Sequence, residues 1–175
     1  LSILSVLIKD YIIKKHNIRF SKGDSLGEDA VFNMNYLYHL GGNIAYVDKI
    51  LYSYCDVNPT SLCKANYDAY AKSYENIFNA YKELFTKLGA DSPENIIDLH
   101  SYHYNEILRS AILYATDKAM TKKERFKAFK TFIYLPAFDQ CRKKASAEKV
   151  GDRKVFMMSK IRPFLLLYIL IKEIL

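Results

Sequence analysis

The chain has 175 residues, half of them hydrophobic, and a formal net charge of +7. This length is enough for one sizeable folded domain, and the hydrophobic content excludes an intrinsically disordered protein. The three cysteines form no C-x-x-C pair and no metal-ligand spacing, which excludes a disulfide scaffold and favours a reducing, cytoplasmic location.

The segment Ser25-Leu26-Gly27-Glu28-Asp29 precedes an apolar run at 30–40, and the pattern predicts a helix that begins near the acidic pair. Two interpretations of the pair are open. Ser25 and Glu28 have the spacing of a capping box, and acidic side chains are favoured at a helix N-terminus. Alternatively, one of the two carboxylates serves as a general base.

Four short segments follow one another in the first third of the chain. They are a lysine-rich run that ends in Asn17-Ile18-Arg19-Phe20, the Gly-Glu-Asp sequence at 27–29, a predicted hairpin at 44–54 that ends in tyrosines, and Asn58-Pro59-Thr60-Ser61. Their order and spacing resemble the acceptor side of the catalytic domain of family-2 glycosyltransferases, which have the GT-A fold. The resemblance covers roughly residues 5–63.

The resemblance implies an inverting transfer of sugar from a nucleotide-sugar donor to a glycan or lipid-linked acceptor. Asp29 would be the general base, and Glu28 would hold the acceptor or orient the base. Gly27, Tyr54 and Ser61 would lie on the acceptor-binding side. Because a carboxylate can take the proton of the acceptor hydroxyl as the new bond forms, this chemistry needs no covalent intermediate.

The chain departs from the family pattern at Ser5-Val6, where a pair containing lysine is usual, and at Cys55, where a polar residue is usual. It also contains no Asp-x-Asp sequence, which the family uses to hold a divalent cation on the donor diphosphate. We therefore expect a fragment that lacks the nucleotide-binding half and is inactive by itself. Magnesium or manganese would be bound by that other half, and this chain would bind no metal.

Beyond residue 63 the pattern predicts a helical region. Apolar residues from Tyr67 to Leu88 recur at alternating steps of four and three, which predicts an amphipathic helix that ends at Gly89. Three further helices are predicted. One begins at Ser92-Pro93 and fades near Thr116, and the next begins at the capping box of Thr121 and Glu124 and ends or bends at Pro136. The last begins near Asp152 and breaks at Pro163.

We therefore predict a mainly α (α+β) fold. Residues 1–63 would be the acceptor-side part of a GT-A-like domain, with a remnant of its sheet and a short β-hairpin. Residues 64–175 would be a C-terminal helical bundle. Within it, the helix that begins at Ser92-Pro93 would bury one face, which contains Ile97, His100, Tyr104, Leu108 and Ala111. His100, His103 and Glu106 have a poor spacing for one metal ion, and we expect the polar flank of a packed helix there instead of a metal site.

The basic charge is concentrated near the C-terminus, where residues 117–175 contain 15 Lys and Arg against 6 Asp and Glu. The apolar run at 163–171 follows Arg153, Lys154, Lys160 and Arg162, and it is too short to span a bilayer. Residues 153–175 would either lie on the inner face of a membrane or dock into the bundle core.

No recognition helix or RNA-binding signature is present, so we expect no nucleic-acid partner. An alternative to the transferase is therefore a helical protein-interaction or membrane-surface module without catalysis.

Overall fold

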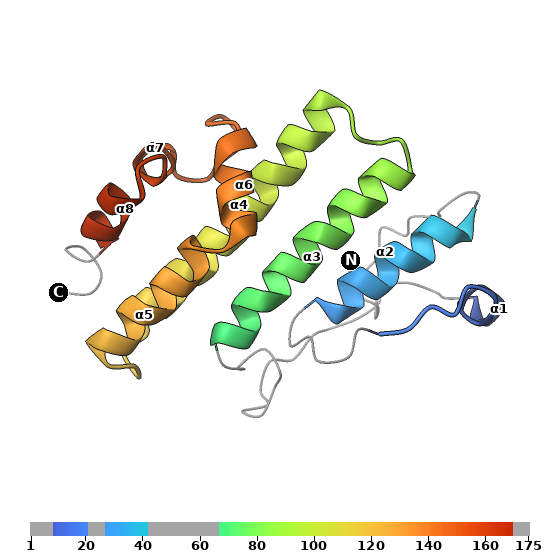
Figure 1. Cartoon of the computed structure of the whole chain (residues 1–175), viewed down its shortest axis with the longest axis horizontal. Helices are drawn as coiled ribbons and strands as arrows, with labels where there is room; N and C mark the ends of the chain where they lie inside the picture. Colours follow the sequence, from blue (N-terminus) through green and yellow to red (C-terminus); the bar gives the residue numbers. More distant parts are fainter. Residues whose placement is uncertain (1–8, 21–26, 42–66, 170–175) are drawn as a thin grey trace, which may run out of the picture. The chain divides into compact units, whose positions relative to one another are not determined.

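The computed structural model describes residues 9–20, 27–41 and 67–169 (Figure 1). All regular elements in these ranges are helices, so the mainly α prediction is confirmed for this part of the chain. The predicted hairpin at 44–54 lies outside the described residues. The helices are α1 (Asp10–Lys15), α2 (Glu28–Leu40), α3 (Tyr67–Lys87), α4 (Pro93–Thr116), α5 (Lys122–Ile133), α6 (Pro136–Lys144), α7 (Arg153–Ser159) and α8 (Arg162–Ile169).

The chain divides into two compact units, residues 1–89 and 90–175. The division falls after α3, so this helix belongs with α1 and α2. The boundary predicted between residues 63 and 64 lies outside the described residues. Among the described helices, none combines the length and apolarity that a membrane crossing requires.

In the first unit, α2 packs against both α1 and α3. Apolar side chains of α1, of the segment after it and of α2 form one buried cluster, with Ile12, Ile18, Phe32 and Tyr36 at its centre. The hydroxyl of Tyr36 accepts a hydrogen bond from the backbone N–H of Lys9 at 2.9 Å. This bond ties the start of α1 to the middle of α2.

Helix α3 follows the predicted stripe, of which Ala71, Tyr74, Ile77 and Phe78 are buried. The helix ends at Lys87, so Leu88 lies beyond it and is 54% exposed. Gly89 has a φ of 62°, a left-handed conformation that commonly terminates helices. The predicted end of this helix near Gly89 is confirmed, but Leu88, the last residue of the predicted stripe, is not buried.

In the second unit, α4 packs against α5 and α6. The predicted helix starts are confirmed: Ser92 Oγ accepts from Asn95 N–H at 3.3 Å, and both hydrogen bonds of the capping box between Thr121 and Glu124 are present. Pro136 separates two helices, because α5 ends at Ile133 and α6 begins at Pro136 itself. Proline is well tolerated at this first helical position, where its missing N–H would have no helical partner.

Helices α7 and α8 pack against each other, and a hydrogen bond from Tyr104 joins α7 to α4. The hydroxyl of Tyr104 donates to Ser159 Oγ at 3.1 Å, and the Tyr104 ring contacts Phe138 and Phe156. The chain breaks between Ser159 and Arg162, slightly before the predicted position, because Pro163 is accommodated in the first turn of α8.

The connection between α6 and α7 is hydrogen-bonded to α4 along its length. Ser146 N–H donates to Ser101 Oγ at 3.0 Å. The Asn105 amide donates to the Lys149 carbonyl at 3.2 Å and accepts from Gly151 N–H at 3.0 Å. Because two side chains of one helix hold three backbone groups of this connection, it is an ordered part of the second unit.

Candidate functional site

The paired acids Glu28 and Asp29 occupy the first two positions of α2, with Gly27 as its N-cap. The carbonyl of Gly27 accepts from Val31 N–H at 2.9 Å and closes the first turn. In a capping box begun by Ser25, Glu28 would occupy the third helical position. Because Glu28 is instead the first helical residue, the capping-box interpretation of this pair is wrong. Ser25 itself lies outside the described residues.

Two independent constraints require glycine at position 27. Its φ of 73° lies in the left-handed region, which is unfavourable for residues with a β carbon. In addition, a β carbon built at this position would overlap Cδ1 and Cγ1 of Ile77 on α3. The start of α2 is therefore seated directly on α3, and this contact fixes where the two carboxylates begin.

The two carboxylates are half-buried. Asp29 Oδ1 accepts a hydrogen bond from Ala30 N–H at 2.8 Å. Among the residues that the structure describes, no ion pair involves Glu28 or Asp29. The positive end of the helix dipole favours negative charge at these positions. Chemically, the pair can accept hydrogen bonds or a proton from a hydroxyl group that approaches the start of α2.

The segment that precedes the acidic pair in the chain packs one turn further along α2. The ring of Phe20 stacks on that of Phe32 with 4.4 Å between ring centroids, and Ile18 is buried in the same cluster. His16 stacks on His39 at 4.0 Å. Partial burial, followed by the charges of His16 and Lys87, lowers the pKa of His39. These contacts support α2 from the side of α1.

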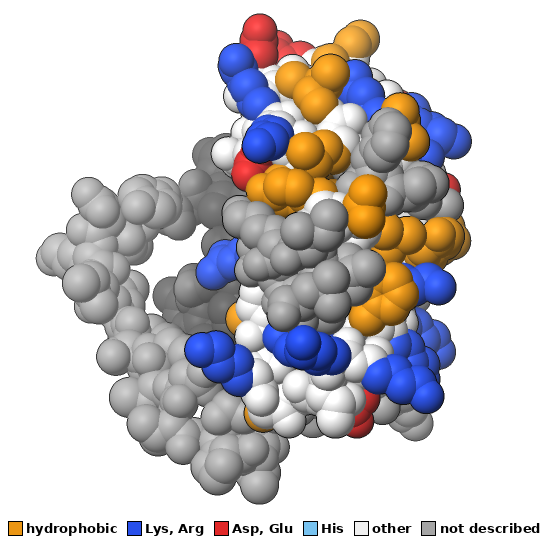
Figure 2. All heavy atoms as spheres, turned by 90° about the vertical axis from the view of Figure 1, so that its left-hand side faces the viewer, with side chains coloured by type: hydrophobic (Ala, Val, Ile, Leu, Met, Phe, Trp, Pro, Cys, Tyr) orange, Lys and Arg blue, Asp and Glu red, His pale blue; other side chains and the backbone are white. Residues whose placement is uncertain are grey.

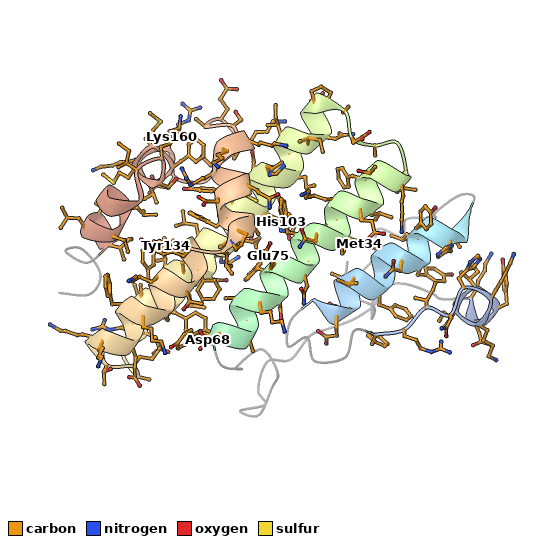
Figure 3. The ribbon with its side chains drawn as sticks, in the orientation of Figure 1. Met34, Asp68, Glu75, His103, Tyr134 and Lys160 are labelled. Carbon is orange, nitrogen blue, oxygen red and sulfur yellow. The ribbon has the colours of Figure 1, made fainter. Side chains whose placement is uncertain are left out.

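A small groove of about 110 Å³ separates part of α2 from part of α3. Val31, Met34, Asn35 and Tyr38 line it from α2, and Ala80, Glu83, Leu84 and Lys87 line it from α3; Figure 3 labels Met34. The lining includes neither Glu28 nor Asp29, and ligand pockets usually have several times this volume. We therefore do not assign the groove to the candidate site.

Of the predicted acceptor-side residues, Gly27 is adjacent to the acidic pair, whereas Tyr54 and Ser61 lie outside the described residues. The candidate site within the described part of the chain is thus the single turn Gly27-Glu28-Asp29.

The two histidines of α4 are buried (Figure 3 labels His103). The predicted burial of His100 is confirmed, whereas the prediction that His103 lies on a polar flank was wrong. His100 is 2% exposed and His103 is 1% exposed. Burial, followed by the charge of His100, lowers the pKa of His103 to about 4. The sequence carried a signal that was missed: Leu99, His103 and Ile107 recur every four residues, and all three are buried.

Within the described ranges, no three His, Cys, Asp or Glu side chains gather in a way that could hold a metal ion. The divalent cation that the resemblance implies for a whole enzyme therefore has no ligand set to assign there. Comparisons with protein-family models, with curated proteins and with solved structures give no match to this chain.

Proposed function

We propose that the chain is the acceptor-side and C-terminal part of an inverting, nucleotide-sugar-dependent glycosyltransferase that acts on a glycan or lipid-linked acceptor. The observation that carries the proposal is the acidic pair on the first turn of α2. Glu28 and Asp29 follow a glycine that the structure requires, and neither forms an ion pair within the described part of the chain. The order of segments in the sequence, from Asn17 to Ser61, supports the same function.

In the proposed reaction, Asp29 accepts the proton of an acceptor hydroxyl. The freed oxygen attacks the anomeric carbon of the donor sugar, and the bond from that carbon to the diphosphate oxygen breaks. The electron pair leaves on the nucleoside diphosphate, and the configuration of the anomeric carbon is inverted. Glu28 accepts a hydrogen bond from the acceptor and orients it. The donor and its cation would be held by residues outside the described ranges.

The test is sugar transfer by the complete protein that contains this chain, assayed with a panel of nucleotide sugars. We expect Asp29→Asn to lower kcat by roughly 10²–10⁴-fold, the usual contribution of a general base. Donor affinity should change little, because the carboxylate acts on the acceptor. The asparagine carbonyl can still accept from Ala30 N–H, so the thermal unfolding temperature should stay near that of the parent protein.

A matched control is Asp91→Asn, which removes a carboxylate from an exposed position before α4. We expect this variant to keep full transfer activity. The proposal is overturned if Asp29→Asn transfers sugar at the parent rate. It is also overturned if the variant loses activity only in proportion to a loss of folded protein, since Asp29 would then have only a structural role at the start of α2.

The alternative of a helical interaction module rests on the apolar stripe of α3. A partner helix would need that stripe to be accessible. Ala71, Tyr74, Ile77 and Phe78 are each 9% exposed or less, so the centre of the stripe is already covered in the folded chain. We therefore prefer the transferase.

A further inference from the structure

Helices α7 and α8 have one face packed into the second unit. On α7 this inner face contains Val155, Phe156 and Ser159, and on α8 it contains Leu165 and Ile169; all are buried. Ser159 also accepts the hydrogen bond from Tyr104 of α4. The docked interpretation of this region is therefore correct for one face of each helix.

The opposite face exposes large apolar side chains. Met157 is 56% exposed, Ile161 is 52% exposed, and Leu167 is 53% exposed. Helical spacing places Met157 opposite Val155 and Ser159 on α7, and Leu167 opposite Leu165 and Ile169 on α8. Ile161 lies in the short connection between the two helices. We call these three residues and the basic residues around them, Arg153, Lys154 and Lys160, the outer face.

The charged residues of α7, α8 and the link between them are all basic. Residues 153–169 contain four basic residues and no Asp or Glu, and the side chains of Arg153, Lys154 and Lys160 are exposed. The Lys154 ammonium lies 5.8 Å from the Tyr168 ring centroid, and the Lys160 ammonium lies 5.5 Å from the Phe156 ring centroid. Each ammonium thus lies over an aromatic ring while its side chain stays accessible to solvent. Figure 2 shows hydrophobic and basic side chains interspersed on this side of the second unit, with few acidic ones.

We propose that the outer face docks on an anionic phospholipid surface. Met157, Ile161 and Leu167 would enter the boundary between headgroups and acyl chains, and the basic residues would contact lipid phosphates. This combination of apolar and basic side chains is typical of interfacial helices. The eight residues of α8 extend about 12 Å, far less than the hydrocarbon core, so the helix would lie on the membrane. The inference rests on the second unit and does not depend on the proposed transfer reaction.

The first experiment measures cosedimentation of the full chain with vesicles. We expect binding to phosphatidylcholine vesicles that contain about 30% phosphatidylglycerol and little binding to pure phosphatidylcholine. The double variant Lys154→Gln/Lys160→Gln should weaken binding by about 30-fold, since each basic residue near an anionic surface contributes about fivefold. The charge-matched control is Lys15→Gln/Lys118→Gln, which alters two exposed lysines elsewhere and should bind as the parent does.

The second experiment uses the absence of tryptophan from the chain, so that one introduced indole reports on one position. A Leu167→Trp variant should show a blue-shifted emission and quenching by brominated lipids when anionic vesicles are added. The control Leu113→Trp places the indole at a 66%-exposed position on α4 and should show neither effect. Circular dichroism of each variant checks that the helices have formed.

Three results would overturn the proposal. One is equal binding to neutral and anionic vesicles. Another is binding that the lysine variants lose while Leu167→Trp emission does not change, which would indicate a general affinity for polyanions such as RNA. The third is self-association of the parent chain that is abolished by Met157→Ser/Leu167→Ser, with no vesicle binding, which would assign the outer face to a second copy.

Discussion

Gly27 lies so close to Ile77 that no side chain can be added at position 27 without displacing the Ile77 side chain. This relationship joins the turn that carries the acidic pair to the middle of α3. We predict that Gly27→Ala lowers the free energy of unfolding by about 2–3 kcal/mol, because it combines left-handed strain with overpacking. Urea unfolding followed by circular dichroism measures this change.

Gly89 provides the matched control for Gly27. It also has a positive φ, of 62°, but a β carbon there would have no atom within 4 Å. Gly89→Ala should therefore cost only the backbone strain, about 1 kcal/mol. Equal losses for the two variants would show that the contact with Ile77 contributes nothing to stability.

The hydrogen bond between Tyr104 and Ser159 should show the asymmetry of a buried polar pair. Ser159→Ala leaves the Tyr104 hydroxyl without its acceptor in an apolar environment, which should cost about 1–3 kcal/mol. Burial raises the pKa of Tyr104 to about 12, so near neutral pH its hydroxyl stays protonated and remains a donor that needs an acceptor.

A double-mutant cycle isolates the bond. In Tyr104→Phe/Ser159→Ala the Tyr104 hydroxyl is removed together with its acceptor, so this hydroxyl is no longer left unsatisfied and the double variant should lose less than the sum of the single variants. The loss of the Ser159 hydrogen bond to the Phe156 carbonyl is common to Ser159→Ala and the double variant and cancels in the cycle. Additive losses, measured by urea unfolding, would contradict a direct interaction between the two side chains.

The stability of the second unit should fall in mild acid because of His103. Burial lowers its pKa in the folded protein from 6.5 to about 4, so the unfolded chain binds the proton more readily in this range. Stability is therefore complete above pH 6.5 and is lost progressively down to pH 4. Between pH 7 and pH 5 the expected loss is about 2 kcal/mol, from denaturant unfolding at each pH.

A His103→Leu variant should remove this part of the pH dependence, because leucine has no proton to bind. His16 is exposed on the other unit, and His16→Gln should leave the pH profile of the second unit unchanged. A parent profile that matches that of His103→Leu between pH 7 and pH 5 would refute the assignment.

The ends of the helices could be predicted from the sequence because they depend on neighbouring residues. Ser92, Thr121 with Glu124, Pro136 and Gly89 each act within a turn of their own position, and each marks an observed helix end. The break before α8 differs from the prediction by a few residues, because proline tolerates the first turn of a helix as readily as it ends one.

Features that depend on contacts between residues far apart in the sequence could not be predicted from local patterns. The capping-box prediction failed at Glu28 because Gly27, supported by Ile77 about 50 residues later, begins the helix instead. His103 was predicted to lie on a polar flank because histidine is a polar residue, although its position belongs to an i, i+4 series of buried residues. Likewise, no local pattern in the sequence places α3 in the same compact unit as α2, since that grouping depends on tertiary packing.

The hydrogen bonds that join Ser101 and Asn105 of α4 to the connection before α7 determine what a protease cut in this connection would produce. Beyond Lys149, the chain is held to α4 by the hydrogen bond between Tyr104 and Ser159 and by the bond from Gly151 N–H to Asn105. A protease that cut once after Lys149 would therefore leave a nicked protein whose two pieces stay together until a denaturant is added. Gel filtration would show one peak from such a sample, and only a denaturing gel would reveal the cut.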